Sequence, residues 1–371
     1  GTSLPEIVLH LVGSAEIILS SGVPIQLLAV DPLISILGGH AEALQSLVQQ
    51  GHITNETASA SKEVFKQTSG TVMGASIGSD VVQETLVMGF VIISSAFLAG
   101  KRGFRFSRKF LIRDYAPMMA TTLITLILAL NWKGIFSHVL GGSLNLTGTL
   151  TRLDGIILVG SFVLYMWYLY TTRKEELAEK GDFKASKNPS MDLILGLVAM
   201  FLVIGSAEIV LRVIEVAVAQ TGLSGSMIGV ATVGVVSALP EMITAISGLR
   251  HGSEGISLGT LVGSNVTNPL LAIGSGAVLS SYAVPRPLVL WDLPMETVLA
   301  GIPVVYMFSK ERVGKIMAKP FRAIEIESVA EKLESAENRV LSIVGALLLI
   351  LLYFVYLYVR FTYFQHDFAS H

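Results

Sequence analysis

The sequence begins with GTSLPE at residues 1–6, and a close copy, VSALPE, occurs at residues 236–241. Two further pairs follow in the same order. They are GASIGSD at 74–80 with GTLVGSN at 259–265, and DYAP at 114–117 with DLP at 292–294. Three matching elements in one order indicate an internal repeat. The sequence therefore predicts two related halves, each with its own Pro-Glu step.

Long apolar runs surround these motifs. Hydrophobic residues make up 52% of the 371-residue chain and charged residues 15%, whereas soluble domains carry about 25% charged residues. We expect nine apolar spans, at about 1–19, 71–99, 110–131, 154–171, 191–218, 224–248, 255–281, 287–308 and 340–360. Each is close to the ~20 residues that cross a bilayer as a helix. This predicts an all-α, multi-pass integral membrane protein, because a backbone in lipid must satisfy its own hydrogen bonds.

Alternate loops between the spans differ in charge. The basic set contains Lys101, Arg102, Arg105, Arg108, Lys109, Arg173, Lys174, Lys180, Lys184, Lys187, Arg250 and the segment 309–339. The cation-poor set comprises 39–70, 132–152, 282–288 and 361–371. The positive-inside rule places the basic set in the cytoplasm. Glu6 then lies on a helix running outward and Glu241 on one running inward, so the halves are inverted, as in many secondary transporters.

We expect the first half at 1–171, with a partly polar insertion at about 20–70, and a cytoplasmic linker at 172–190. The second half is expected at 191–371, with a charged cytoplasmic segment at about 309–339. Residue 1 lies inside an apolar motif without a polar flank. We therefore expect an upstream helix and part of the first span to be absent from the sequence.

The motif helices carry oxygen-bearing side chains four residues apart, which places both on one helix face. The pairs are Thr2 and Glu6, Ser79 and Gln83, Ser237 and Glu241, and Ser264 and Asn268. Pro5 and Pro240 lack an N–H, so the carbonyls four residues earlier lose their helical partner. These all-oxygen donors fit a hard cation, and calcium tolerates their irregular geometry better than magnesium. Glycines at GxxxG spacing, Gly74, Gly78, Gly259 and Gly263, predict close helix packing.

Several other classes of protein are disfavoured. The chain has no cysteine, which excludes disulfides and thiolate metal sites, and zinc or copper is not expected with His10 as the one histidine in the site helices. HExxH and Walker motifs are missing from the sequence, and no cofactor is expected. A formal net charge of −2 gives no indication of a nucleic-acid partner.

The two Pro-Glu motifs and the two GxxxGS motifs resemble the paired alpha-repeats of the calcium/cation antiporter superfamily, which includes sodium/calcium and calcium/proton exchangers. The resemblance covers almost the whole chain outside 20–70. It implies ten helices in two inverted five-helix halves, so nine spans fit one missing first helix. It also implies transport rather than enzymatic activity, with calcium and a counter-ion as partners; the oligomeric state stays open.

The resemblance implies that Glu6 and Glu241 are the central calcium ligands and that Gln83 and Asn268 hold the other two corners. Supporting ligands are implied at Thr2, Ser3, Ser79, Ser237 and Ser264. Sodium/calcium exchangers carry Asn and Asp at the two corners, whereas this chain carries amides at both. That departure is closer to the calcium/proton branch.

Charge counting favours protons as the counter-ion. Two glutamates balance one Ca²⁺ or two H⁺, whereas three Na⁺ would leave an excess of charge in a medium of low dielectric. Asp80 occupies the position where the second repeat has Asn265. If Asp80 faced the site, it would supply a third negative charge and balance three Na⁺. The alternative is that Asp80 is a carboxylate with a role in packing or in supporting the site. Glu84 is expected to face elsewhere. Ca²⁺/H⁺ exchange is thus the first hypothesis and Na⁺/Ca²⁺ exchange the second.

A cation channel is a further alternative, although channels usually repeat their filter around a symmetric oligomer. An intramembrane aspartyl protease is suggested only faintly by Gly78-Ser79-Asp80, because a second motif aspartate of that type is missing. Saturable counter-transport separates an exchanger from a channel, and peptide cleavage would reveal an enzyme.

Overall fold

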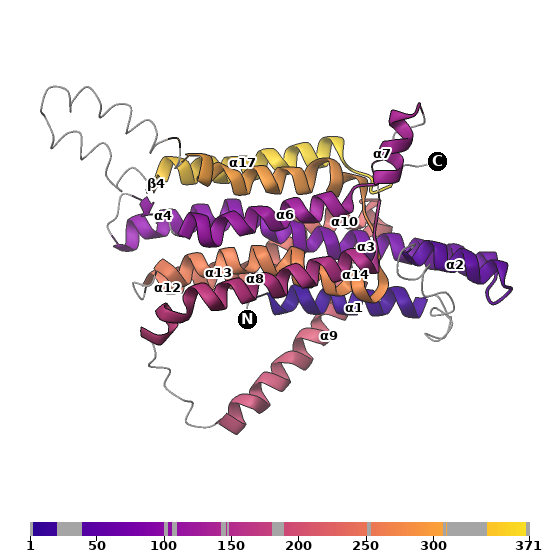
Figure 1. The fold of residues 1–371 in the computed structure, drawn as a ribbon, viewed down its shortest axis with the longest axis horizontal. Helices are drawn as coiled ribbons and strands as arrows, with labels where there is room; N and C mark the ends of the chain where they lie inside the picture. Colours follow the sequence, from indigo (N-terminus) through magenta and orange to yellow (C-terminus); the bar gives the residue numbers. More distant parts are fainter. Residues whose placement is uncertain are drawn as a thin grey trace, which may run out of the picture.

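The computed structural model describes residues 3–20, 39–99, 103–105, 110–141, 146, 148–179, 189–250, 254–306, 309 and 340–368. These residues form a bundle of long helices that lie side by side (Figure 1). Thr2, residues 180–188 of the predicted linker and nearly all of the charged segment 309–339 lie outside the described residues.

Six described helices are long and apolar enough to cross a membrane. They are Asn55–Phe97, Leu111–Ala129, Arg152–Thr172, Gly225–Arg250, Leu288–Tyr306 and Ile343–Tyr363. Each coincides with a predicted span. In the most apolar part of Asn55–Phe97, 67% of residues are buried, against 11% in Arg152–Thr172. Asn55–Phe97 therefore lies in the centre of the bundle, and Arg152–Thr172 presents most of its side chains outward, as a lipid-facing helix does.

The other three predicted spans are also helical. α1 (Leu4–Ser20) has 17 residues, and α9 (Pro189–Thr221) has 33. The third is a continuous helical segment made of α13 (Glu254–Thr267), η5 (Asn268–Ile273) and α14 (Gly274–Ser280). All nine predicted spans thus correspond to helices in the part of the chain that the structure describes.

The second span begins earlier than expected. α3 (Asn55–Val82) starts at a cap where Thr54 Oγ1 accepts a hydrogen bond from the Thr57 N–H at 3.2 Å, and it continues through η2 (Gln83–Val87) into α4 (Met88–Ala99). The start of α3 and the short α2 (Gly39–Gln49) project beyond the bundle in Figure 1. The predicted insertion at about 20–70 is therefore partly helical and includes the first turns of α3.

Equivalent helices of the two halves run in opposite directions. α1, which carries Glu6, runs from left to right in Figure 1, and α12 (Leu239–Arg250), which carries Glu241, runs from right to left. α3 and its counterpart α13 show the same reversal. α6 (Ala116–Ala129) and Leu288–Tyr306 contain the prolines of the third motif pair, and α8 (Arg152–Glu179) and α17 (Ile343–Tyr363) are the last long helices of the two predicted halves.

Two short antiparallel strand pairs join the halves. β1 (Gly103–Arg105) pairs with β4 (Val340–Ser342), and β2 (Thr149–Leu150) pairs with β3 (Tyr282–Ala283). Each pair takes one strand from each half. The strands therefore tie loops of the two repeats to one another outside the helices.

π-helical turns occur at matching places in the two halves. η2 begins at Gln83 and η5 begins at Asn268, each four positions after the serine of a GxxxGS motif. η3 (Leu111–Tyr115) and η6 (Leu288–Asp292) precede Pro117 and Pro294 in the third matched pair. A proline cannot donate its backbone nitrogen to the preceding turn, which favours such local widening. π-bulges are frequent at functional sites, and here they start at both amide corners.

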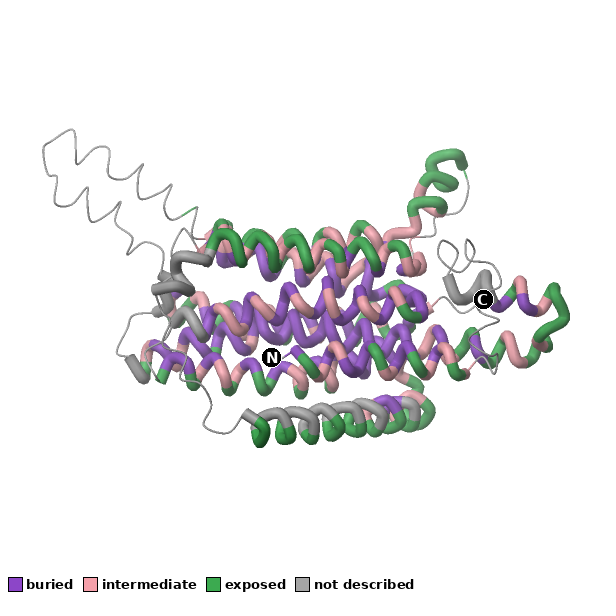
Figure 2. Tube along the Cα trace, turned by 60° about the horizontal axis from the view of Figure 1, so that its bottom comes forward, coloured by how far each residue is buried: buried purple, intermediate pink, exposed green. Residues whose placement is uncertain are grey.

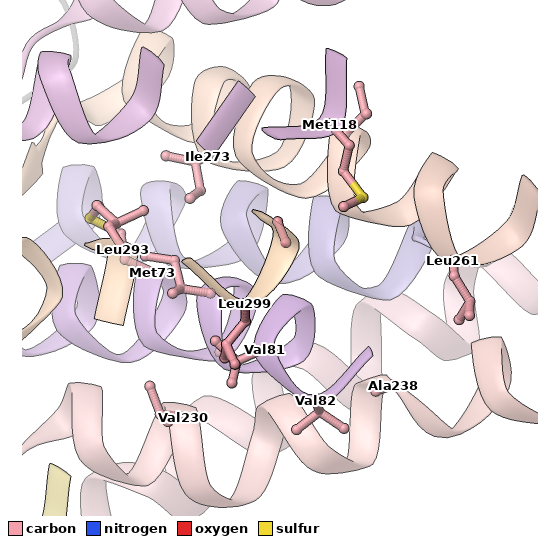
Figure 3. Close-up of a cluster of buried hydrophobic side chains, with 14 of the residues drawn as sticks. Met73, Val81, Val82, Met118, Val230, Ala238, Leu261, Ile273, Leu293 and Leu299 are labelled. Atoms are coloured by element: carbon pink, nitrogen blue, oxygen red, sulfur yellow. The ribbon is translucent and has the colours of Figure 1, made fainter. Parts of the chain in front are cut away.

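The centre of the bundle is packed closely. Buried positions concentrate there in Figure 2, and Figure 3 shows apolar side chains from both halves meeting, among them Met73, Val81 and Val230. A methyl group placed on Gly74 would lie 2.5 Å from the Ser226 carbonyl oxygen, and one on Gly78 would lie 2.6 Å from the Val230 Cα. Backbones therefore touch directly where the first GxxxG motif crosses the second half.

The prediction of close packing is wrong for the second GxxxG motif. A methyl group at Gly259 or Gly263 would meet no described atom within 4 Å. The first motif packs on residues 226–230, which precede the second Pro-Glu step. No described backbone is placed against the second motif in the way that residues 226–230 are placed against the first.

Candidate cation-binding site

Glu6 and Glu241 lie in the first turns of α1 and α12, and both side chains are buried, with 2% and 0% exposure. Pro240 cannot donate to the Val236 carbonyl, and the helix is broken at Ala238, between α11 (Gly234–Ser237) and α12. The two glutamates are near enough for their charges to repel. The inverted halves thus bring one carboxylate each to a shared, water-poor place.

A chain of hydrogen bonds connects these carboxylates. Ser79 Oγ donates to Glu6 Oε1 at 3.2 Å, and Ser264 Oγ donates to Glu241 Oε1 at 3.4 Å. The Gln83 side-chain amide lies between the two serines and donates to Ser79 Oγ at 3.1 Å and to Ser264 Oγ at 3.2 Å. The spacing of four between Ser79 and Gln83 therefore does place both groups on one face. The connected set contains residues of both halves.

Three oxygen atoms at this place are buried without a hydrogen-bond partner. They are Glu6 Oε2, Gln83 Oε1 and Asn268 Oδ1. Each amide uses its nitrogen within the network, so its oxygen is left over. Buried oxygens without a donor are costly, and a bound cation removes that cost. The donor set contains carboxylate, amide and hydroxyl oxygens, which is the chemistry that calcium prefers.

Asp80 supports the site from the side. Its Oδ1 accepts a hydrogen bond of 2.7 Å from Asn268 Nδ2, which holds the amide with its oxygen turned away from Asp80. Asp80 is 1% exposed and feels the charge of Glu6 less strongly than that of Glu84 or Glu296. Asp80 thus contacts the Asn268 corner, which favours the role of a supporting carboxylate.

The remaining predicted ligands occupy different positions. Ser3 Oγ donates to Ser264 Oγ at 2.9 Å and so joins the network across the halves. Ser237 Oγ donates to the Gly234 carbonyl at 3.2 Å, and the Ser237 side chain also interacts with Glu6. Thr2, the equivalent of Ser237, lies outside the described residues.

A second group of buried acids lies next to the first, and the sequence analysis missed it. Glu84 faces away from Gln83, as expected, but it is buried, and its Oε1 accepts from Asn265 Nδ2 at 3.2 Å. Glu296 lies on the helix Leu288–Tyr306 and accepts from Thr122 Oγ1 at 3.0 Å. The available signal was a carboxylate four residues after Asp292 inside an apolar span.

A buried ion pair lies one helical turn from Glu296. Arg360 Nε donates to Asp292 Oδ2 at 3.1 Å, and Tyr356 Oη donates to Asp292 Oδ1 at 2.8 Å. Both charged side chains have 0% exposure. Arg360 also donates to Ser226, which is hydrogen-bonded to Asp367. Asp292 therefore has a cationic partner, whereas the partners described for Glu84 and Glu296 are neutral side chains.

A cavity of about 330 Å³ opens onto the site from the side of α9. Its lining includes Glu6 and Ser237 among mostly apolar residues of α1, α9 and the segment before α12. Within the described ranges, no three His, Asp or Glu side chains converge closely enough to enclose a metal ion. The oxygen donors gathered here are therefore carboxylates mixed with amides and hydroxyls.

Comparison with known proteins adds to this picture. The Inner membrane protein YrbG of Escherichia coli is 24% identical over 219 residues, covering 56% of this chain and 60% of that protein. The Uncharacterized membrane protein MJ0091 of Methanocaldococcus jannaschii is 23% identical over 269 residues, covering 70% of this chain and 76% of that protein. The chain thus spans about three fifths of the length of YrbG.

Among solved structures, the sodium-calcium exchanger NCX_Mj is similar with a TM-score of 0.47 and 15% identity, covering 98% of each chain. The family profile described as "Sodium/calcium exchanger protein" matches residues 47–171 and 191–362, which is most of both halves. The chain belongs to the sodium/calcium exchanger protein family, a family of cation transporters and not of enzymes.

Proposed function

We propose that this protein is a secondary-active antiporter that exchanges Ca²⁺ for H⁺ across a membrane at the Glu6–Glu241 site. One observation carries the proposal: hydrogen bonds run from Glu6 through Ser79, Gln83 and Ser264 to Glu241. One continuous site is thus built from both inverted halves. Family membership supports cation exchange, and the choice of ions rests on the site.

Calcium fits the donors in number and kind. Calcium takes 6–8 oxygen ligands at about 2.3–2.6 Å in irregular geometry. Two carboxylates, two amide oxygens and the hydroxyls of Ser79 and Ser264 supply such a set. Magnesium requires a tighter octahedron and keeps its water, which a buried site of this size does not provide.

Protons fit the charge and the leftover acceptors. Two ionised glutamates balance one Ca²⁺, and two protons neutralise the same glutamates. Asp80 is engaged by Asn268, so it adds no direct ligand at the centre. When Glu6 and Glu241 are protonated they become donors, and Gln83 Oε1 and Asn268 Oδ1 then serve as acceptors. The same amide oxygens thus act in both loaded states.

Alternating access follows from these shared ligands. The empty site carries two uncompensated charges in a water-poor interior, and exposing it to the other side in that form is unfavourable. The loaded forms are neutral. Movement of one helix group against the other then switches the side of the membrane from which the site is accessible. The cavity beside α9 gives access to Glu6 in this structure.

Na⁺/Ca²⁺ exchange is the second candidate. The observation that favours it is the additional buried acids Asp80, Glu84 and Glu296, since three sodium ions need more than two negative charges. Sodium is the weaker candidate because two of these acids face away from the four corners.

The test is a flux assay in vesicles that contain purified protein. Acid-loaded vesicles should take up ⁴⁵Ca²⁺ when placed in a more alkaline buffer, with or without sodium. Uptake driven by a sodium gradient and indifferent to the proton gradient would refute the proton proposal and establish the second candidate. Current without counter-transport would instead indicate a channel.

Matched substitutions on one helix control for folding. Glu6→Gln should abolish uptake, and Glu241→Gln should do the same. Glu16→Gln is the control, because Glu16 lies on α1 about 15 Å from Glu6 along the axis and is bonded to Thr68. It should retain uptake. Equal loss in Glu6→Gln and Glu16→Gln would contradict the assigned site.

A further inference from the structure

Four buried oxygen atoms beside the central site have no hydrogen-bond partner. They are Glu84 Oε2, Glu296 Oε2, Asn265 Oδ1 and Tyr115 Oη. They come from four segments, η2, Leu288–Tyr306, α13 and η3. All four side chains are at most 2% exposed. The large majority of buried side-chain polar atoms have a hydrogen-bond partner, so four unpaired oxygens in neighbouring side chains indicate a missing ligand.

The second oxygen of each acid is held in place. Glu84 Oε1 is bonded to Asn265 Nδ2 at 3.2 Å, and Glu296 Oε1 is bonded to Thr122 Oγ1 at 3.0 Å. Asn265 is in turn positioned by Thr121, whose Oγ1 contacts the Asn265 carbonyl at 3.4 Å. In each carboxylate, the hydrogen bond to Oε1 fixes the orientation of the group and therefore the position of the unpaired Oε2. The unpaired oxygens are thus preorganised.

The local charge is negative. Glu296 is the strongest charged neighbour of both Glu84 and Asp80, and Glu84 also acts on Tyr115. In the described part of the chain, the charged neighbours of Glu84 and Glu296 are other carboxylates, and Arg360 is taken by Asp292. Buried carboxylates without a cationic neighbour are neutralised either by protons or by a bound cation.

We propose that Glu84, Glu296, Asn265, Thr122 and Tyr115 form a second cation site, separate from the Glu6–Glu241 site, that takes a divalent ion such as Ca²⁺. Two carboxylates balance the charge of one divalent ion. The amide, hydroxyl and phenol oxygens complete an all-oxygen set of the kind that calcium accepts. The choice of calcium rests on the proposed function, whereas the donor geometry does not.

Asp80 connects the two sites. It is bonded to Asn268 at a corner of the central site, and it feels the charges of Glu296, Glu84 and Glu6. Two bound cations at these neighbouring sites repel each other, so each lowers the affinity of the other site for its ion, as in multi-ion pathways. The second site thus holds a calcium ion next to the transport position.

Equilibrium dialysis with ⁴⁵Ca²⁺ on the purified, chelator-treated chain tests the proposal by counting bound ions. The wild type should bind two calcium ions per chain at saturation. Glu84→Gln combined with Glu296→Gln should bind one, and Glu6→Gln combined with Glu241→Gln should also bind one. Glu16→Gln, the control with the same chemical change, should bind two.

The outcomes separate this inference from the proposed function. A wild type that binds one ion, lost on changing Glu6 and Glu241 but kept on changing Glu84 and Glu296, would overturn the second site and leave the central one. The reverse pattern would overturn the central site and keep the second. If the Glu84→Gln, Glu296→Gln variant fails to fold, the Glu6→Gln, Glu241→Gln variant decides: one remaining bound ion keeps the second site, and none refutes it.

Discussion

Ser264 is the most connected hydroxyl of the site, and replacing it with alanine tests the network. Ser264 accepts from Ser3 at 2.9 Å and from Gln83 at 3.2 Å, and it donates to Glu241 at 3.4 Å. Ser264→Ala removes all three bonds and keeps the Cβ, so packing is little changed. The two neutral bonds are worth about 0.6 kcal/mol each, as in other membrane bundles. A bond to a charged acceptor adds about 1.5 kcal/mol.

The expected loss in calcium-free unfolding free energy is therefore about 2–3 kcal/mol. The assay is denaturant unfolding in mixed micelles. Ser275→Ala is the matched control, because Ser275 lies on the same continuous helical segment and makes one bond, to the Ala272 carbonyl at 3.0 Å. Its loss should stay near about 0.6 kcal/mol. Equal destabilisation by the two variants would refute the network as described.

Three further predictions use the same chain. Gly78→Ala should destabilise the protein by about 1–3 kcal/mol in the same unfolding assay, because the new methyl group would lie 2.6 Å from the Val230 backbone. Gly263→Ala should be neutral or stabilise the protein by up to about 1 kcal/mol, because no described atom lies within 4 Å of the new methyl group. Arg360→Met should lower the unfolding free energy by about 3–5 kcal/mol, because it leaves Asp292 buried without its partner. Adding Asp292→Asn should recover part of this loss. No recovery in the double variant would contradict the ion pair. Asp80→Asn should weaken calcium binding tenfold or less in dialysis while proton-driven uptake persists, because the Asn268 amide exchanges a charged acceptor for a neutral amide oxygen and no central ligand is removed. Complete loss of uptake, as in Glu6→Gln, would make Asp80 a direct ligand instead.

The membrane class, the helices and the paired Pro-Glu steps could be predicted because each depends on local pattern. A span is recognised by its length and polarity, and the repeat is visible in the motifs themselves. The bond between Gln83 and Ser79 follows from helical spacing alone. These features need no knowledge of which helices touch.

The second acidic group could not be predicted because it depends on contacts between distant segments. Glu84 was expected to face away from the Gln83 face, and it does. What lies on that other side is Asn265, separated from Glu84 by 181 positions in the sequence. Glu296 meets Thr122 across 174 positions. Helical periodicity says which residues share a face, and it does not say what that face contacts.

The two GxxxG motifs show the same limit. Their spacing is identical, yet Gly74 and Gly78 touch the backbone of the second half while Gly259 and Gly263 touch nothing described within 4 Å. Close approach needs a partner at the right place, and the motif alone does not supply one.

The most direct test of the central claim is a structure of the protein determined with bound Ca²⁺. The account predicts ion density between the Glu6 and Glu241 carboxylates, with both within about 2.3–2.6 Å of the ion and with an amide oxygen of Gln83 or Asn268 among the ligands. Density held by one of the two glutamates alone, or absent from this place in a calcium-loaded protein, would contradict a single site shared by the two halves.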